Sequence, residues 1–138
     1  MPEHAFEYAL IRVVPRVERG ECLNVGVVLL CRQLRFLEAR IVLDKGRLAF
    51  FAPDLDLEAV AEQLDLIPLV CAGGRQAGPI GELPLYERFR WLTAPRSTVI
   101  QPSPVHVGLC TDPRTALERI CRQVILPINS GSGQDSVQ

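Results

Sequence analysis

The sequence predicts a single α+β domain in which a mainly antiparallel sheet packs against two or three helices. Three observations predict this class: β-rich apolar runs, two segments with apolar residues at helical spacing, and short turn-rich links between them. A chain of 138 residues is long enough for one buried core, and we expect residues 1–128 to form it. Residues 129–138 are polar and are expected to be a flexible C-terminal tail.

The first three strands are expected to form an antiparallel meander. Residues 8–14 and 24–31 are apolar at alternate and intervening positions alike, which is typical of central strands covered on both faces. Residues 34–43 alternate more clearly and predict a strand nearer the edge of the sheet. The short links between these runs favour pairing of consecutive strands.

The middle of the chain predicts a turn, a helix and a loop. Residues 44–46 are expected to form the turn. Asp54 can cap a helix whose apolar stripe is spaced at i, i+3, i+4 and i+7, and Pro68 is expected to end or restart it. That stripe consists of Leu57, Val60, Ala61 and Leu64. The glycine-rich residues 73–81 predict a flexible connector.

The last third predicts short strands followed by one helix. The strands are expected at residues 86–91, 97–101 and 105–110. The helix is expected to begin at Thr111 or Asp112 with Pro113 in its first turn.

Composition excludes several classes of protein. A net charge of −1 and an aromatic content of 6% argue against nucleic-acid binding, although Arg16, Arg19, Arg32, Arg35 and Arg40 give the N-terminal half a basic bias. No apolar run approaches the roughly 18 residues that span a bilayer, and the N-terminus lacks signal-peptide features. We therefore expect a cytoplasmic protein.

The five cysteines predict neither a metal site nor a redox couple. They are scattered, and none forms a Cys-x-x-Cys pair. Most stand among aliphatic residues, which favours small buried side chains in a reducing compartment. The 73–81 loop lacks the Gly-Lys-Ser/Thr ending of a phosphate-binding P-loop. We therefore predict no metal and no cofactor.

Arg12 is the residue of the first strand that departs from core chemistry. A buried guanidinium requires an anionic partner or an opening to solvent. Glu21, across the loop that follows Pro15, is a candidate partner for an internal ion pair. Alternatively, Arg12 joins Arg16, Arg19 and Arg96 in a pocket for a phosphate or a carboxylate.

A second candidate site surrounds Arg96. Ser97 and Thr98 follow it directly, and Gln101 and His106 come soon after. Hydroxyl, amide and guanidinium groups on one loop suit a phosphate or a planar polar ligand. The alternative is that these hydroxyls satisfy backbone groups at turns and strand ends.

The order of Ser97, His106 and Asp112 also permits a hydrolase hypothesis. A catalytic triad requires these side chains within mutual hydrogen-bond reach, and no nucleophile-elbow motif supports it. If residues 105–110 form a strand, His106 points opposite to Val105 and Val107 and hence away from the core.

Two blocks of sequence resemble a bacterial family, the domain of unknown function 3037 family. The first is Tyr8-x-Leu-Ile-Arg-Val-Val-Pro15 continued by Arg19-Gly-Glu-x-x-Asn-Val-Gly-Val27. The second is residues 88–101 followed by Pro104-x-His106-x-Gly108 and Asp112-Pro113, while Cys22 replaces a bulkier apolar residue that is more typical of the family. The resemblance implies no activity, but members are often encoded beside HipA-like kinases, which implies a protein partner of that type.

The sequence thus favours a non-catalytic binding or regulatory module. The alternative is a small hydrolase or transferase that acts on a phosphate- or carboxylate-bearing ligand through an arginine, Ser97 and His106.

Overall fold

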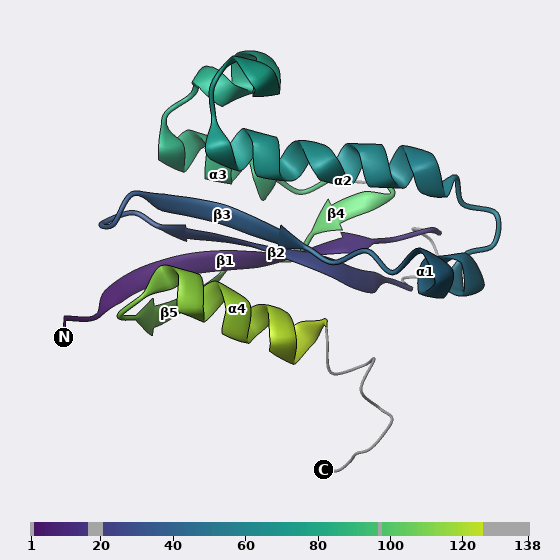
Figure 1. The fold of residues 1–138 in the computed structure, drawn as a ribbon, viewed down its shortest axis with the longest axis horizontal. Helices are drawn as coiled ribbons and strands as arrows, with labels where there is room; N and C mark the ends of the chain where they lie inside the picture. The colour runs from purple at the N-terminus through teal and green to yellow at the C-terminus, as the bar shows by residue number, and fades with distance from the viewer. Residues whose placement is uncertain (1, 17–20, 97, 126–138) are drawn as a thin grey trace, which may run out of the picture.

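The structure is a computed structural model that describes residues 2–16, 21–96 and 98–125. It has three layers: a sheet lies in the middle, α2 and α3 cover one face, and α4 covers the other (Figure 1). The predicted α+β class with a mainly antiparallel sheet is confirmed. The predicted tail, residues 129–138, lies outside the described residues.

The predicted meander is confirmed. Strands β1 (His4–Val13), β2 (Leu23–Cys31) and β3 (Phe36–Ile41) pair antiparallel in chain order. The sheet order is β3-β2-β1-β4, so the two apolar runs are central and the alternating one is at the edge. Strands β5 (His106–Cys110) and β4 (Ile100–Pro102) pair with successive halves of the other edge of β1.

Alternate side chains of β1 enter two separate cores. Ala9, Ile11 and Val13 belong to the cluster between the sheet and the α2–α3 layer, whereas Phe6 packs in the cluster under α4. The β1–β2 register shifts between Ile11 and Arg12, a β-bulge that increases local twist.

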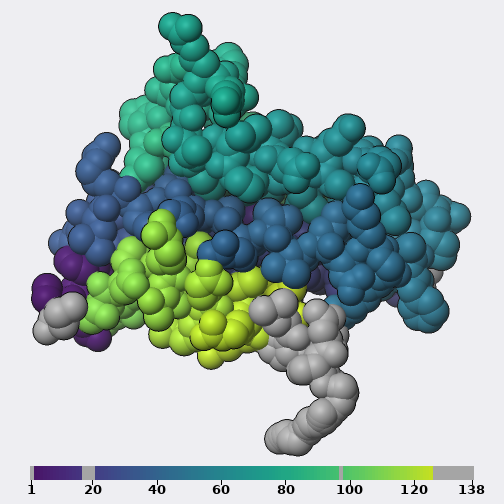
Figure 2. Space-filling model, in the orientation of Figure 1, coloured from purple at the N-terminus to yellow at the C-terminus, as the bar shows by residue number. Residues whose placement is uncertain are grey.

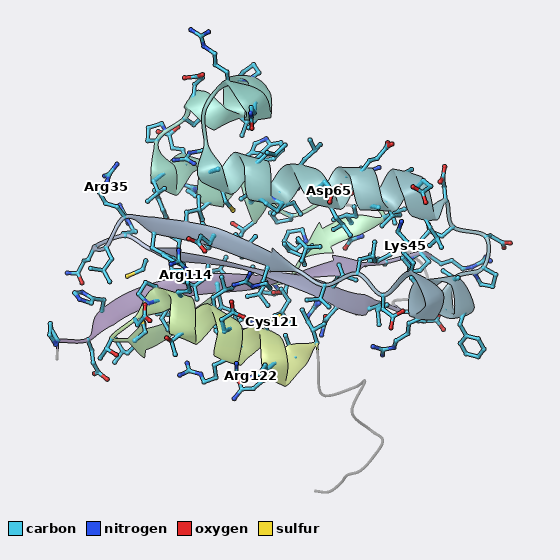
Figure 3. All side chains as sticks on the ribbon, viewed as in Figure 1. Arg35, Lys45, Asp65, Arg114, Cys121 and Arg122 are labelled. Atoms are coloured by element: carbon cyan, nitrogen blue, oxygen red, sulfur yellow. The ribbon has the colours of Figure 1, made fainter. Side chains whose placement is uncertain are left out.

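Helix α4 (Pro113–Val124) begins as predicted, with Asp112 as its N-cap and Pro113 in the first turn. Its buried stripe, which includes Leu117 and Cys121, faces the sheet while Arg122 points away (Figure 3). Arg114 and Glu118 on this helix form ion pairs with Glu38 and Arg40 of β3.

Helix α2 (Leu57–Ala72) differs from the prediction at both ends. Its N-cap is Asp56, which accepts a hydrogen bond from the Ala59 amide, so the assignment of Asp54 as cap is wrong. The helix continues through Pro68 instead of ending there. The turn beyond the proline buries Val70 and Cys71, and this burial offsets the missing amide hydrogen bond.

Two short helices were predicted as other structure. Residues 44–46 are the start of α1 (Lys45–Phe51), capped by Asp44, and the predicted strand 86–91 is helix α3 (Leu85–Leu92). In α3, Leu85, Phe89 and Leu92 recur at i, i+4 and i+7 and pack in the core, so a helical period is present but short.

The predicted connector at residues 73–81 is largely the 3₁₀ segment η2 (Arg75–Glu82), kinked at Gly78. It forms a knob that projects from the body of the molecule beside α2 (Figure 2). Gly73, Gly74 and Gly78 take positive φ angles that other residues rarely adopt. Within the part of the chain that the structure describes, no helix has the length and apolar character needed to cross a membrane.

The close approach of β2 to β3 at Gly26 gives a first test of the fold. A Cβ atom there would lie 2.9 Å from the Arg40 carbonyl oxygen and 2.8 Å from Ile41 Cδ1. We expect Gly26→Ala to lower the free energy of unfolding by about 1–3 kcal/mol, because the backbone carbonyl cannot move without breaking the ladder. Chemical denaturation measures the effect.

Gly46→Ala is the matched control. A Cβ atom at Gly46 would meet only the Asp44 side chain, at 3.6 Å, so stability should stay the same or rise by up to about 1 kcal/mol. Equal effects of the two substitutions would contradict the packing described for Gly26.

Candidate functional site

The part of the predicted site around Arg96 lines an apolar groove between α2, α3 and the segment that leads into β4. The groove encloses about 190 Å³. Trp91 and Leu66 at its mouth are 42% and 54% exposed, unusually high for large apolar side chains. We name it the Trp91 groove; its lining residues are Gln63, Leu66, Ile67, Val70, Trp91, Leu92, Arg96, Thr98 and Ile100.

Arg96 is positioned by Trp91. Its guanidinium carbon lies 4.7 Å from the centre of the Trp91 ring, and Nη2 donates to the Trp91 carbonyl oxygen at 2.5 Å. The stacked arrangement holds one positive charge at a mainly apolar groove. Within the described residues, Arg96 forms no ion pair with a carboxylate, so the charge is available to an anionic group.

The hydroxyl and amide predicted beside Arg96 satisfy local backbone groups. Thr98 Oγ1 donates to the Ile100 carbonyl, and Gln101 Nε2 donates to the Thr98 carbonyl, both at 2.8 Å. Thr98 still lines the groove, whereas Gln101 does not. Ser97 lies outside the described residues, and its predicted role stays a prediction.

Arg12 occupies the opposite face of the sheet. It is aligned with Asn24 on β2 and with Gln101 on β4, so these three side chains form a polar row across three strands. Directly opposed residues share a face, and neighbouring Ile100 faces the other cluster, with Val13. Among the described residues, the Arg12 row and the Trp91 groove therefore lie on opposite faces of the sheet.

The Arg12 guanidinium has no counter-charge within the described part of the chain. No ion pair links it to Glu21, the partner suggested by sequence, and its buried Nε atom makes no hydrogen bond there. Asn24 Nδ2 in the same row lies 3.5 Å from the carbonyl of Val124 at the end of α4. Arg12 thus remains a candidate for binding an anion on this face.

Arg16 lies in a third place. Its guanidinium pairs with Asp54 at 3.5 Å, at an open depression of about 470 Å³ between the end of β1 and the start of α2. Both side chains are largely exposed, so the pair contributes little stability. Arg19 lies outside the described residues. The four arginines predicted to form one pocket are therefore not brought together in the part that is described.

The described members of the proposed triad have other contacts. His106 is exposed on β5, and its ring centre lies 5.2 Å from that of Tyr8. Asp112 caps α4, accepting from the Arg114 amide and the Thr115 hydroxyl. The hydrogen bond from Thr115 is the main reason why the pKa of Asp112 lies below its usual value. These contacts explain both residues structurally, and the hydrolase hypothesis stays an untested prediction.

Sequence reasoning missed two residues that organise the groove side. The strand that the sequence predicts at residues 86–91 includes Trp91 and gives it no role in binding. Arg88 donates from Nε to the Leu83 carbonyl and from Nη1 to those of Val70 and Cys71, which ties α3 to the last turn of α2. The i, i+4, i+7 apolar spacing in residues 85–92 is the signal that would have placed both on a helix.

The fold and these sites define a small α+β protein with an apolar groove beside α2 and α3. Among its described residues, no group of three His, Cys, Asp or Glu side chains could hold a metal ion. By sequence, the chain belongs to the family described as protein of unknown function (DUF3037), whose model matches residues 8–125. No curated protein and no solved structure matches the chain.

Arg12 and Arg88 should respond differently to replacement by methionine. We expect Arg12→Met to change the free energy of unfolding by less than about 1 kcal/mol, because the guanidinium forms no ion pair with a described residue. Arg88→Met should cost about 2–4 kcal/mol, because three backbone carbonyls lose a charged donor. Denaturant titration of both variants compares them directly. A loss above about 2 kcal/mol for Arg12→Met would show that Arg12 is a structural brace.

The cysteines should differ sharply in reactivity. Cys22 is exposed, whereas Cys31, Cys71, Cys110 and Cys121 are buried. Burial raises the pKa of Cys71 to about 12, so this thiol stays protonated at neutral pH. We expect one thiol of the native chain to react quickly with a disulfide reagent and the rest only on unfolding. Rapid native reaction of several thiols, or continued rapid reaction in Cys22→Ser, would contradict this burial pattern.

Proposed function

We propose that this chain is a non-catalytic binding module that holds an apolar group of its ligand in the Trp91 groove, next to an anionic group held by Arg96. The observation that carries the proposal is the Arg96 guanidinium stacked on Trp91 at the cavity. A concave apolar site with a few oriented polar groups is the usual form of a binding site.

The chemistry of the lining defines the ligand class. Leu66, Ile67 and Val70 give the groove an aliphatic wall, and Trp91 gives it an aromatic one. A cavity of about 190 Å³ accommodates one apolar side chain or a short aliphatic or aromatic group. The free N–H groups of Arg96 would bind a carboxylate or phosphate close to that group.

The ligand can belong to a protein partner or be a small molecule. An exposed Trp–Arg pair is typical of the residues that contribute most to protein–protein binding. The partner class implied by the family resemblance, a HipA-like kinase, is the one to test first. A small apolar carboxylate offers the same chemistry and forms the second arm of the test.

The described residues of the hydrolase hypothesis are His106 and Asp112. His106 and Asp112 have the contacts described above, and the buried cysteines are poor nucleophiles. Turnover of a nucleotide, phosphoester or peptide that is lost in His106→Ala would contradict the proposal and favour the hydrolase or transferase.

Trp91 is the only tryptophan of the chain and therefore reports groove occupancy by its fluorescence. We expect octanoate and phenylacetate to shift its emission, and calorimetry to detect binding of a HipA-like kinase. Arg96→Ala should raise the Kd of a true ligand about tenfold or more, through the lost charged hydrogen bonds. Trp91→Ala, followed by calorimetry, should raise it about 30-fold.

Arg90→Ala is the matched control, because Arg90 is an exposed arginine on α3, the helix that carries Trp91, and does not line the groove. It should leave the Kd unchanged. If Arg96→Ala and Arg90→Ala weaken binding equally, the attraction is one of overall charge and the groove is not the site.

A further inference from the structure

Among the described residues, strand β5 has one hydrogen-bonded edge and one open edge. It pairs with β1 over five positions, from His4 opposite Cys110 to Tyr8 opposite His106. No other strand in the described ranges pairs with it, and no backbone hydrogen bond from another described segment reaches it. Its outer N–H and C=O groups can therefore accept another strand.

The side chains on one face of β5 and of the residue before it are apolar and uncovered. Val105, Val107 and Leu109 are 40%, 71% and 62% exposed. On the opposite face Cys110 is buried and Gly108 packs against the Phe6 ring, whereas His106 at the start of the strand is exposed. Val107 also borders an open hollow of about 370 Å³ at the end of the sheet. The layer formed by α2 and α3 therefore leaves this corner of the sheet bare.

The two edges of the sheet differ in how they are protected. The other edge strand, β3, carries Glu38 and Arg40, both ion-paired to α4. Residues 105–110 contain no Lys, Arg, Asp, Glu or Pro. Charges and prolines are the usual devices that prevent edge strands from associating. An edge without them, bearing exposed aliphatic side chains, has the chemistry of an interface.

We infer that β5 pairs antiparallel with β5 of a second copy of this chain. The pattern Val105-x-Val107-x-Leu109 is aliphatic at the same spacing in either direction. A two-fold axis beside Val107 therefore places Val107 opposite its counterpart and Val105 opposite Leu109. All three apolar positions of each copy are matched, which favours this register over one shifted by a single residue.

Charge is compatible with this two-fold pairing. Glu7 of β1 is aligned with Val107 of β5 and is the acidic residue of this cross-strand pair. The two Glu7 side chains would be separated by three strand spacings, about 14 Å. That distance exceeds the Debye length of about 8 Å at physiological salt, so their repulsion is screened. The joined sheet would be about eight strands wide, within the usual range.

The oligomeric state tests the inference. Light scattering on the full chain at about 50 µM should give twice the 15.3 kDa chain mass. Val107→Lys should give the monomer mass, because it places two like charges opposite each other. Its melting temperature should equal that of the native chain when the native chain is dissociated as well. Leu66→Lys, at an apolar position of similar exposure on α2, should remain dimeric. A native monomer, or a dimeric Val107→Lys variant, overturns the inference.

Cross-linking tests the register itself. In a Cys22→Ser background, Val107→Cys should form a disulfide-linked dimer under mild oxidation, since opposed residues of antiparallel strands lie within disulfide range. Leu66→Cys in the same background should not. Equal cross-linking of both variants overturns the inference, as does a chain that stays monomeric and pairs only with a strand of another protein.

Discussion

Strand β1 is hydrogen-bonded along both edges, to β2 on one side and to β5 and then β4 on the other, and this pairing constrains the rest of the molecule. Ser103 bridges the interval between β4 and β5, because its hydroxyl accepts from the Leu10 amide and its own amide donates to the Leu10 carbonyl. The ladder along this edge is thereby continuous. The pairing therefore fixes which face of the sheet each side chain of β1 points to. The residue aligned with it on the neighbouring strand points to the same face.

This pairing explains why the predicted binding residues separate. Arg12 and Gln101 are opposed on β1 and β4 and share the face that α4 partly covers, whereas Ile100 turns toward the other face and leads into the Trp91 groove. Arg96 therefore cannot join Arg12 without reversing the strand. Residues that are close in sequence, such as Thr98 and Gln101, come to serve different sides of one sheet.

The elements that could be predicted well from the sequence are those with a long apolar run or a clear helix-capping residue. The sequences of β1 and β2 are mostly apolar, which is typical of central strands. The Asp112-Pro113 pair is typical of a helix start and predicts the N-cap of α4. The short helix α3 was missed because eight residues rich in aromatic and charged side chains satisfy a strand pattern as well as a helical one. Its helical state depends on tertiary contacts, namely the burial of Phe89 and the hydrogen bonds of Arg88.

The candidate sites were less predictable because residue type does not reveal which face a layer covers. The alternation in 105–110 correctly set His106 against Val105 and Val107, but the expectation that the valine face is buried was wrong. An alternating strand has a core face only where a second layer extends over it, and the α2–α3 layer ends short of β5. Similarly, the polar and charged residues around Arg96 predict a site there. The role of Trp91 in lining the groove could not be predicted, because the sequence predicts a strand where α3 lies.

The groove and the open edge of β5 belong to the same side of the sheet yet share no residue. Ile100 of β4 forms the groove wall, whereas the apolar corner begins at Val105, beyond the Ser103 bridge. Pairing of two copies through β5 would therefore leave both Trp91 grooves unobstructed by shared contacts. A dimer built in this way presents two identical grooves related by a two-fold axis, so a dimeric partner whose binding segments match their spacing would engage both at once. Such a partner would bind far more tightly than the affinity of one groove allows, without any additional contact.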